Sequence, residues 1–423
     1  MTWRRFAVAL LPGALLLFAA ACGGSSGSKN TTSGGGGGST VVNQLAVSVN
    51  SGISTQFSYT NGIFVSVTVC QPGSTANCVT VPNVLLDTGS TGVRLLSGAG
   101  SNGKTVSSIG LTNVTSSGKT LTNCVQYLDG SFNWGPVATA NIQLAGEAAS
   151  SVPIQIITEP SDTFPVAPSG CGGTAIDTAD AMGANGILGL SFAQYDCGSA
   201  CAPGTTSNYG NYYSCGTTTA SCTVTTASLS QQLQNPIAKF SVDNNGLMLT
   251  LPSIASSGAV SASGTLTFGV GTQSDNALGS AFVLVPDGYG NFSTTFKTTT
   301  TNYAFIDSGS SALFFLDNAS TGFPDCTTYT GFYCPSSTES LTAANKGASG
   351  TTSTVSFSVA NGDKLLNSSN DVFSDLAGTG VDSTSNPPLD YFDWGLPFFF
   401  GRNVFVVLEG KSVGSQAGPY WAY

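Results

Sequence analysis

Residues 84–93 read VLLDTGSTGV, and residues 304–313 read AFIDSGSSAL. Each segment contains an apolar stretch, an aspartate (Asp87 or Asp307), a hydroxyl residue, a glycine, a serine and a second hydroxyl residue. A single copy is typical of a strand that leads into a turn. Two copies about 220 residues apart in a chain of 423 residues indicate a duplicated structural unit, and therefore two lobes.

The repeated loop suits a pair of acidic groups that work together. The glycine two residues after each aspartate allows a tight reversal of the backbone. The serine three residues after it can donate a hydrogen bond to the carboxylate, and the intervening hydroxyl can bond across to the other lobe. Two carboxyls held within a few ångströms share one proton, so one acts as acid and the other as base on a water molecule. The predicted site consists of Asp87, Thr88, Gly89, Ser90, Asp307, Ser308, Gly309 and Ser310.

Composition excludes several other chemistries. The chain has no histidine, which rules out Ser–His–Asp and Cys–His nucleophile systems and histidine-containing zinc sites. Acid–base work is left mainly to carboxylates, and we expect no metal and no cofactor. A net charge of -10 disfavours nucleic acid and anionic lipid as partners.

At the two Asp loops the chain resembles the pepsin-like aspartic peptidases. The resemblance implies an all-β, bilobal fold, with two related β lobes around a central cleft and few short helices. It also implies an apolar-apolar-Gly segment beside each loop, and residues 187–189 (ILG) match the first and residues 399–401 (FFG) the second. Residues 127–135 (YLDGSFNWG) are similar to the family's flap, which makes Tyr127 either the residue that covers the substrate or an ordinary aromatic residue on a hairpin.

One departure from the family bears on activity. Arg94 stands where the first Asp loop of the family leads to a tryptophan that supports the flap tyrosine, and the flap lacks the usual Tyr-Gly-Thr-Gly. A cation turned toward Asp87 would lower the pKa of that carboxyl and change the shared-proton state. Pairing of Arg94 with Asp87 would therefore favour an inactive cleft.

The N-terminal region predicts export. Residues 1–21 form a signal peptide with two arginines and an apolar run, followed by Cys22 as a lipid-attachment cysteine resembling that of bacterial lipoproteins. Residues 22–40 are rich in glycine and serine and predict a flexible tether. We divide the rest into an N-terminal β lobe with the first Asp loop, the flap and a cysteine-rich insertion (residues 41–270), and a C-terminal β lobe with the second Asp loop (residues 271–423). We expect the mature protein to be a monomer that is exported and anchored by lipid at the bacterial cell envelope, on the outer membrane or the periplasmic face. The alternative is cleavage of the signal peptide without lipid attachment, which would release the protein into the periplasm or the medium.

Ten cysteines remain besides the lipid-attachment residue. An even number in an exported chain predicts five disulfides, with metal binding as the alternative. Proximity in the sequence suggests four local pairs and leaves one distant pair, although spacing alone does not fix the connectivity. The suggested pairs are Cys70 with Cys78, Cys124 with Cys171, Cys197 with Cys201, Cys215 with Cys222, and Cys326 with Cys334.

Alternation of apolar and polar residues predicts short strands along most of the chain. The cysteine-rich stretch at residues 197–222 lacks a clear period and predicts a disulfide-tied loop, and residues 226–234 predict a short helix that ends before Pro236. The strands are predicted at residues 63–70, 141–144, 246–251, 265–270 and 354–359.

A narrower resemblance carries no function. The leader, residues 235–246 (NPIAKFSVDNNG) and residues 268–274 (FGVGTQS) resemble an uncharacterised family of bacterial lipoproteins, the DUF3443 type.

Three functions are compatible with these features. The leading hypothesis is an aspartic endopeptidase that cleaves unstructured polypeptide in the cleft. The second is a catalytically inactive pepsin-like protein whose cleft binds peptide, glycan or another envelope protein. The third is a disulfide-tied surface adhesin in which the Asp loops are structural turns.

Overall fold

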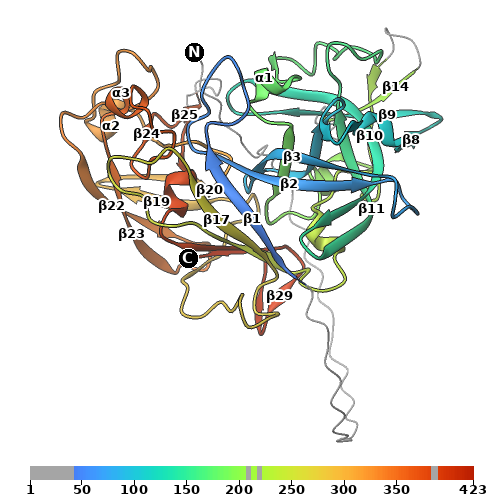
Figure 1. The fold of residues 1–423 in the computed structure, drawn as a ribbon. Coiled ribbons are helices and arrows are strands. Elements are labelled where there is room, and N and C mark those ends of the chain that lie inside the picture. Colours follow the sequence, from blue (N-terminus) through green and yellow to red (C-terminus); the bar gives the residue numbers. More distant parts are fainter. Residues whose placement is uncertain (1–41, 206–210, 217–221, 383–388) are drawn as a thin grey trace, which may run out of the picture.

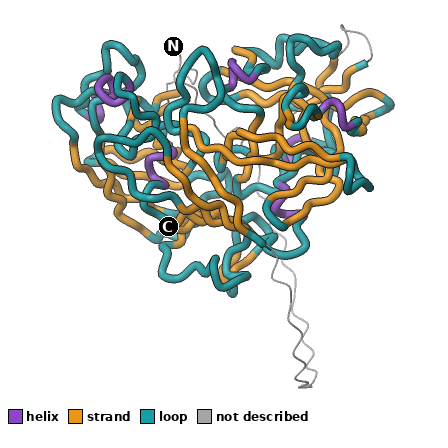
Figure 2. Tube along the Cα trace, in the orientation of Figure 1, coloured by secondary structure: helices purple, strands orange, loops and turns teal. Residues whose placement is uncertain are grey.

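The computed structural model describes residues 42–205, 211–216, 222–382 and 389–423. Figure 1 shows most strands from the first half of the chain, blue to green, on one side of the molecule and most strands from the last third, orange to red, on the other. Figure 2 shows that helices are short and scattered among strands and loops. The prediction of an all-β, bilobal pepsin-like fold is confirmed.

The strands of the first lobe form because alternate residues point into its core. On β2 (Gly62–Cys70), Val65, Val67 and Val69 are buried, whereas Ser66 is exposed. The other strands of this lobe are β3 (Cys78–Asp87), β4 (Thr91–Leu96), β5 (Gly100–Ser101), β6 (Lys104–Thr105), β7 (Thr112–Asn113), β8 (Thr115–Ser116), β9 (Lys119–Gln126), β10 (Ser131–Leu144), β11 (Glu147–Ile157), β12 (Thr174–Ala175), β13 (Gly186–Leu190), β14 (Tyr212–Cys215) and β15 (Cys222–Val224).

The second lobe is built on a seven-stranded sheet with the order β23-β22-β19-β20-β27-β21-β24. Aromatic rings fill its core: the centroids of Phe315 and Phe392 are 4.8 Å apart, and those of Phe392 and Trp394 are 4.4 Å apart. The strands are β19 (Phe292–Phe296), β20 (Thr299–Ile306), β21 (Leu313–Phe315), β22 (Glu339–Lys346), β23 (Thr352–Val359), β24 (Ala377–Gly378) and β27 (Phe392–Trp394).

Strands from both ends of the chain join the two lobes. The strand β1 pairs with β2 and β17, β16 pairs with β28, and β31 pairs with both β28 and β18. The last strands of the chain therefore belong to the eighteen-stranded network of the first lobe and not to the seven-stranded sheet. The joining strands are β1 (Gln44–Asn50), β16 (Gly246–Thr250), β17 (Ala262–Phe268), β18 (Val283–Leu284), β28 (Asn403–Val407) and β31 (Tyr420–Ala422).

Helices contribute little to the described residues, and none of them is both long and apolar enough to cross a membrane. The helix expected at residues 226–234 is wrong. The chain makes one turn there, after which Gln234 forms a β-bridge with Tyr195. The remaining elements are the helices α1 (Ala179–Met182), α2 (Asn318–Thr321) and α3 (Gly362–Leu366), the 3-10 turns η1 (Ser107–Ile109), η2 (Gly198–Cys201), η3 (Pro236–Lys239) and η4 (Leu396–Phe399), and the short strands β25 (Val381–Asp382), β26 (Leu389–Asp390), β29 (Ser412–Val413) and β30 (Gln416–Ala417).

Each Asp loop is threaded by a third strand in the same way. In the first lobe β13 runs parallel to β3 and antiparallel to β4, and in the second β27 runs parallel to β20 and antiparallel to β21. The register pairs Gly189 with Asp87. It also pairs Trp394 with Ile306, so the next residue, Gly395, is the counterpart of Gly189.

The prediction that residues 399–401 thread beside the second loop is therefore wrong, because residues 392–395 (FDWG) occupy that place. Asp393 interrupts the apolar pattern in the true segment. The aromatic run that ends at Phe400 imitates the pattern, but Phe400 forms a bridge with Leu251 instead.

All five predicted disulfides are present. Disulfides persist in oxidising compartments, so the protein belongs outside the cytoplasm, in a periplasmic or extracellular setting.

We expect Gly395→Ala to destabilise the second lobe by roughly 1–3 kcal/mol, because overpacking costs about that much. A Cβ atom at this position would lie 2.1 Å from the carbonyl oxygen of Ala312 and 2.8 Å from that of Ser310. Gly288→Ala is the control, since a Cβ atom there meets nothing within 4 Å. Urea unfolding measures both variants, and equal stability would contradict the threading described above.

Candidate active site

The structure brings the two predicted aspartates together. Asp87 and Asp307 are each 0 % exposed. A Cβ atom on Gly89 would lie 2.6 Å from Cγ of Asp307, and one on Gly309 would lie 2.8 Å from Oδ1 of Asp87. Each aspartate therefore packs against the backbone of the opposite loop, and only glycine leaves room for it.

Backbone and serine groups orient both carboxyls in the same manner. The Oδ1 atom of each aspartate accepts a hydrogen bond from the N–H of the glycine two residues later, at 2.8 Å from Gly89 and 2.7 Å from Gly309. The Oδ2 atom accepts from the serine hydroxyl three residues later, which belongs to Ser90 in the first loop and to Ser310, at 2.8 Å, in the second. Each carboxyl is thus held at both oxygens.

Thr88 and Ser308 link the loops by reciprocal hydrogen bonds, an arrangement that we call the grip. The N–H of Thr88 donates to Oγ of Ser308 at 3.1 Å, and the N–H of Ser308 donates to Oγ1 of Thr88 at 2.9 Å. Each hydroxyl then donates to a carbonyl of the other lobe, Ser308 to Leu86 at 2.9 Å and Thr88 to Ile306 at 3.4 Å. The grip fixes the loops relative to each other from beneath the carboxyls.

The two carboxyls are also close enough for the charge of Asp87 to act on Asp307. Burial raises the pKa of Asp307 well above its usual range, the negative charges of Asp87 and Asp393 raise it further, and the N–H of Gly309 lowers it. Asp307 therefore keeps a proton at pH values at which an ordinary aspartate is ionised.

The hairpin of β9 and β10, with residues 127–130 at its turn, is the flap. Tyr127 is buried, and its hydroxyl donates to Oδ1 of Asn133 at 2.7 Å. Burial raises the pKa of Tyr127, the charge of Arg94 lowers it and that of Asp87 raises it, so this ring lies near both charged groups. The neighbouring Leu128 packs against an apolar cluster of the second lobe that includes Phe314. The turn of the flap thus contacts the second lobe.

The flap is the middle of a small sheet and not a free hairpin. The strand β12 pairs with β10, and β14 from the cysteine-rich insertion pairs with β9 (Figure 1). The disulfide between Cys124 and Cys171 ties β9 to the segment before β12. The insertion, which the sequence predicted to be a loop, therefore supplies a strand that supports the flap.

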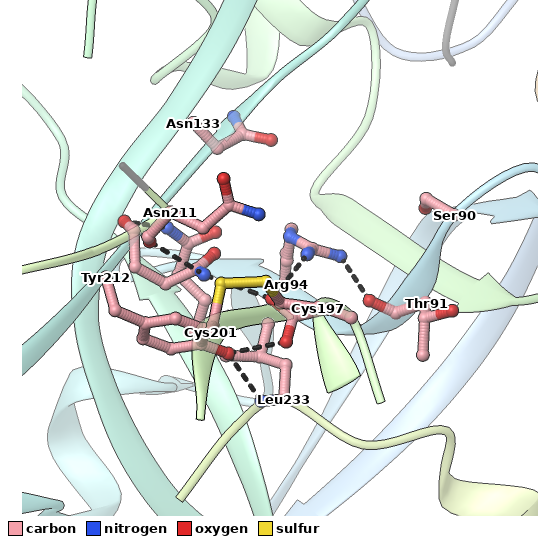
Figure 3. A network of polar contacts seen from close by, with 12 residues as sticks. Ser90, Thr91, Arg94, Asn133, Cys197, Cys201, Asn211, Tyr212 and Leu233 are labelled. Carbon is pink, nitrogen blue, oxygen red and sulfur yellow. Dashed lines mark hydrogen bonds and ion pairs between the residues drawn. A yellow bond between two sulfur atoms is a disulfide. The ribbon is translucent and has the colours of Figure 1, made fainter. Parts of the chain in front are cut away.

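Arg94 is 1 % exposed and pairs with Asp196, not with Asp87. Its Nη2 lies 3.6 Å from Oδ2 of Asp196, and its Nη1 donates to the carbonyl of Thr91 at 2.7 Å. Figure 3 shows Arg94 between Thr91 and Tyr212, whose hydroxyl donates to Oδ1 of Asp196 at 2.5 Å. Burial raises the pKa of Asp196 to about 6, although Arg94 and the hydrogen bond from Tyr212 lower it.

Sequence reasoning missed the polar partners that hold the flap. Asp196 directly precedes the stretch without periodicity (residues 197–222) and Tyr212 lies within it, and no pattern indicates that they meet Arg94. A signal for Asn133 was available, because alternation along residues 131–134 places it on the face opposite Phe132 and Trp134.

A cavity of about 220 Å³ lies behind the flap. Phe132 and Trp134 line it, whereas Asn133 between them faces Tyr127, so this cavity is on the side of β10 away from the flap tyrosine.

Two further predictions concern metal binding by cysteines and lipid attachment at Cys22. Cys326, Cys334 and Asp363 bring metal-ligand atoms close together, but the two sulfurs form a disulfide and leave one carboxylate. The signal peptide, the tether and Cys22 lie outside the described residues.

We expect Arg94→Met to cost about 3–5 kcal/mol of stability at pH 8, because Asp196 is left as an unpaired buried charge. The loss should be smaller at pH 5, where Asp196 takes up a proton and becomes neutral. The double variant Arg94→Met, Asp196→Asn should recover most of it. Urea unfolding at both pH values tests this, and a loss independent of pH would contradict the assigned pairing.

A search of curated proteins finds no match. Among solved structures, the chain is similar to the crystal structure of aspartic proteinase from Irpex lacteus, with a TM-score of 0.46 and 16% identity over 90% of this chain and 96% of that one. Residues 39–423 match the family described as "Protein of unknown function (DUF3443)". The chain therefore belongs to the DUF3443 family.

Proposed function

We propose that this protein is an aspartic endopeptidase that hydrolyses peptide bonds with Asp87 and Asp307. The observation that carries the proposal is the buried pair of carboxyls, each packed against the glycine of the opposite loop and each held by the same glycine and serine hydrogen bonds. Such a pair combines a general acid and a general base without histidine or metal.

The chemistry follows from the shared proton. The ionised carboxyl of the pair takes a proton from a water molecule, whose oxygen attacks the peptide carbonyl carbon, while the protonated carboxyl gives its proton to the carbonyl oxygen. The tetrahedral diol then collapses: the carboxyl that took the proton from water gives it to the amine nitrogen as the C–N bond breaks, and the other carboxyl takes a proton from a diol hydroxyl, which forms the product acid and restores the dyad. The hydrogen bonds from the loop glycines and serines keep both carboxyls aligned through these steps.

The position of Arg94 supports activity. The arrangement that would have favoured an inactive cleft is pairing with Asp87, and Arg94 pairs with Asp196 instead. The positive charge of Arg94 is thus neutralised by Asp196 and not by Asp87 or Asp307.

The substrate in this proposal is an extended polypeptide held between the flap and the dyad. We further propose that Cys22 carries a lipid and that residues 22–40 hold a monomeric peptidase away from the membrane of the cell envelope. The disulfides support export, and the acidic net charge of -10 supports a partner other than nucleic acid.

We expect Asp307→Asn and Asp87→Asn each to lower cleavage of a random peptide library by about 10²–10⁴-fold, because each removes one half of the acid–base pair. The control is Asp375→Asn, since burial raises the pKa of this second-lobe carboxyl to about 6 but it lies outside both Asp loops. The assay runs at several pH values, with a statine-containing peptide as inhibitor. Cleavage that survives in either dyad variant would refute the proposal.

One observation favours a second function, that of an inactive binding protein. Both aspartates are completely buried, and Leu128 holds the flap against the second lobe. A flap that never opened would leave the dyad without access to substrate.

We expect Leu128→Ala to increase opening of the flap roughly tenfold, because it removes part of an apolar contact. Hydrogen exchange of the amides at residues 127–131 measures the opening, with the exposed Leu229→Ala as control. In a peptidase, faster exchange is accompanied by faster cleavage of short peptides. Faster exchange with no cleavage at any pH would support the inactive protein.

A further inference from the structure

Asp393 is a buried carboxyl that the proposed chemistry does not use. It is 1 % exposed and lies on β27, the strand that threads beside the second Asp loop. The register pairs it with Phe305 on β20 and with Phe314 on β21. Both phenylalanines belong to the apolar cluster that receives Leu128 of the flap. These two cross-strand neighbours of Asp393 are therefore apolar.

Asp393 lies on the same face of the sheet as Asp307. Alternate residues of a strand share a face, so Phe305 and Asp307 point the same way. Because Asp393 is paired with Phe305, it is a diagonal neighbour of Asp307. The N–H of Asp307 also donates to the carbonyl of Trp394, the residue after Asp393, at 3.1 Å.

The first lobe shows that this position does not need a carboxyl for structural reasons. The counterpart of Asp393 is Ile187, which is paired with Leu85 and Arg94 in the same register. Ile187 threads beside the first Asp loop and is completely buried. An apolar residue therefore fulfils the structural role, and the carboxyl in the second lobe calls for another explanation.

The charged groups around Asp307 oppose its ionisation. Burial has the largest effect on its pKa, and the charges of Asp87 and Asp393 raise it as well. The strands β20 and β21, which flank β27, carry no charged residue. On the flap side, Tyr127 lies near Asp87, and the cation nearest to that ring, Arg94, is paired with Asp196.

We propose that Asp393 is a positioning residue that holds the dyad proton: it opposes ionisation of Asp307 and so extends hydrolysis to higher pH than Asp87 and Asp307 would support alone. The inference rests on the proposed peptidase function. It adds to that function that a third carboxyl, Asp393, determines the highest pH at which the dyad works.

The test compares Asp393→Asn and Asp393→Leu with the control Asp375→Asn. Aspartate labelled with ¹³C gives a Cγ resonance for Asp307, assigned by its loss in Asp307→Asn, and the pH at which this resonance titrates is measured without substrate. The same variants are assayed for kcat/KM across the pH range.

Where Asp393 is ionised, its charge opposes ionisation of Asp307, so removing it lowers the pKa of Asp307 and the dyad loses its proton at lower pH. We therefore expect the Asp307 resonance and the upper limb of the kcat/KM profile to move to lower pH in both Asp393 variants. Asp375→Asn should move neither. An unchanged Asp307 titration, or an equal shift in the control, would overturn the proposal.

The outcomes separate this inference from the function on which it rests. A chain that cleaves nothing, but whose Asp307 titration moves in the variants, loses the peptidase proposal and keeps the coupling. If neither Asp393 variant folds, the wild-type titration of Asp393 decides, because Asp307 is coupled to Asp87 in any case: a second step in the Asp393 curve where Asp307 titrates supports the coupling, and a single-site curve for Asp393 would overturn it.

Discussion

The grip between Thr88 and Ser308 is the constraint on which the rest of the structure depends. Four hydrogen bonds cross between the lobes at this point, and all of their atoms are buried. A small displacement of one lobe would leave buried donors and acceptors without partners, which costs more than the bonds contribute when formed. The lobes are therefore fixed relative to each other where the aspartates meet. Positions 89 and 309 must be glycine there, because a Cβ atom at either one would clash with the aspartate of the opposite loop.

The flap is held by features that the pepsin-like resemblance did not include. Both of its edges are paired with other strands, and a buried ion pair between Arg94 and Asp196 stands on its inner side where the family has a tryptophan. An ion pair away from water needs further hydrogen bonds to stabilise a structure. Here Tyr212 and Asn123 donate to Asp196 while Nη1 of Arg94 donates to Thr91, although Nε of Arg94 has no partner among the described residues. The position of the flap is thus specified by polar geometry as well as by apolar contact.

Much of the fold could be predicted because short segments of the sequence determine it. The two Asp loops, the first threading segment and the five disulfides are each carried by a short motif or by neighbouring cysteines. The second threading segment could not be found this way, because Asp393 breaks the apolar pattern that identifies it and the aromatic run before Gly401 imitates it. Asp196 illustrates the other limit: a polar partner that is distant in sequence leaves no periodic signal, and only tertiary packing places it beside Arg94.

The pairing of β31 with β18 and β28 has a consequence for the order of events during synthesis. A chain is made from its N-terminus, so the sheet that joins the lobes lacks strands until residues 403–422 have been added. Pairings between segments so far apart also form slowly. A nascent chain therefore carries both Asp loops before the strands that join the lobes are all present. During that interval the growing chain is itself an unfolded polypeptide, the kind of molecule that the finished site is proposed to cleave.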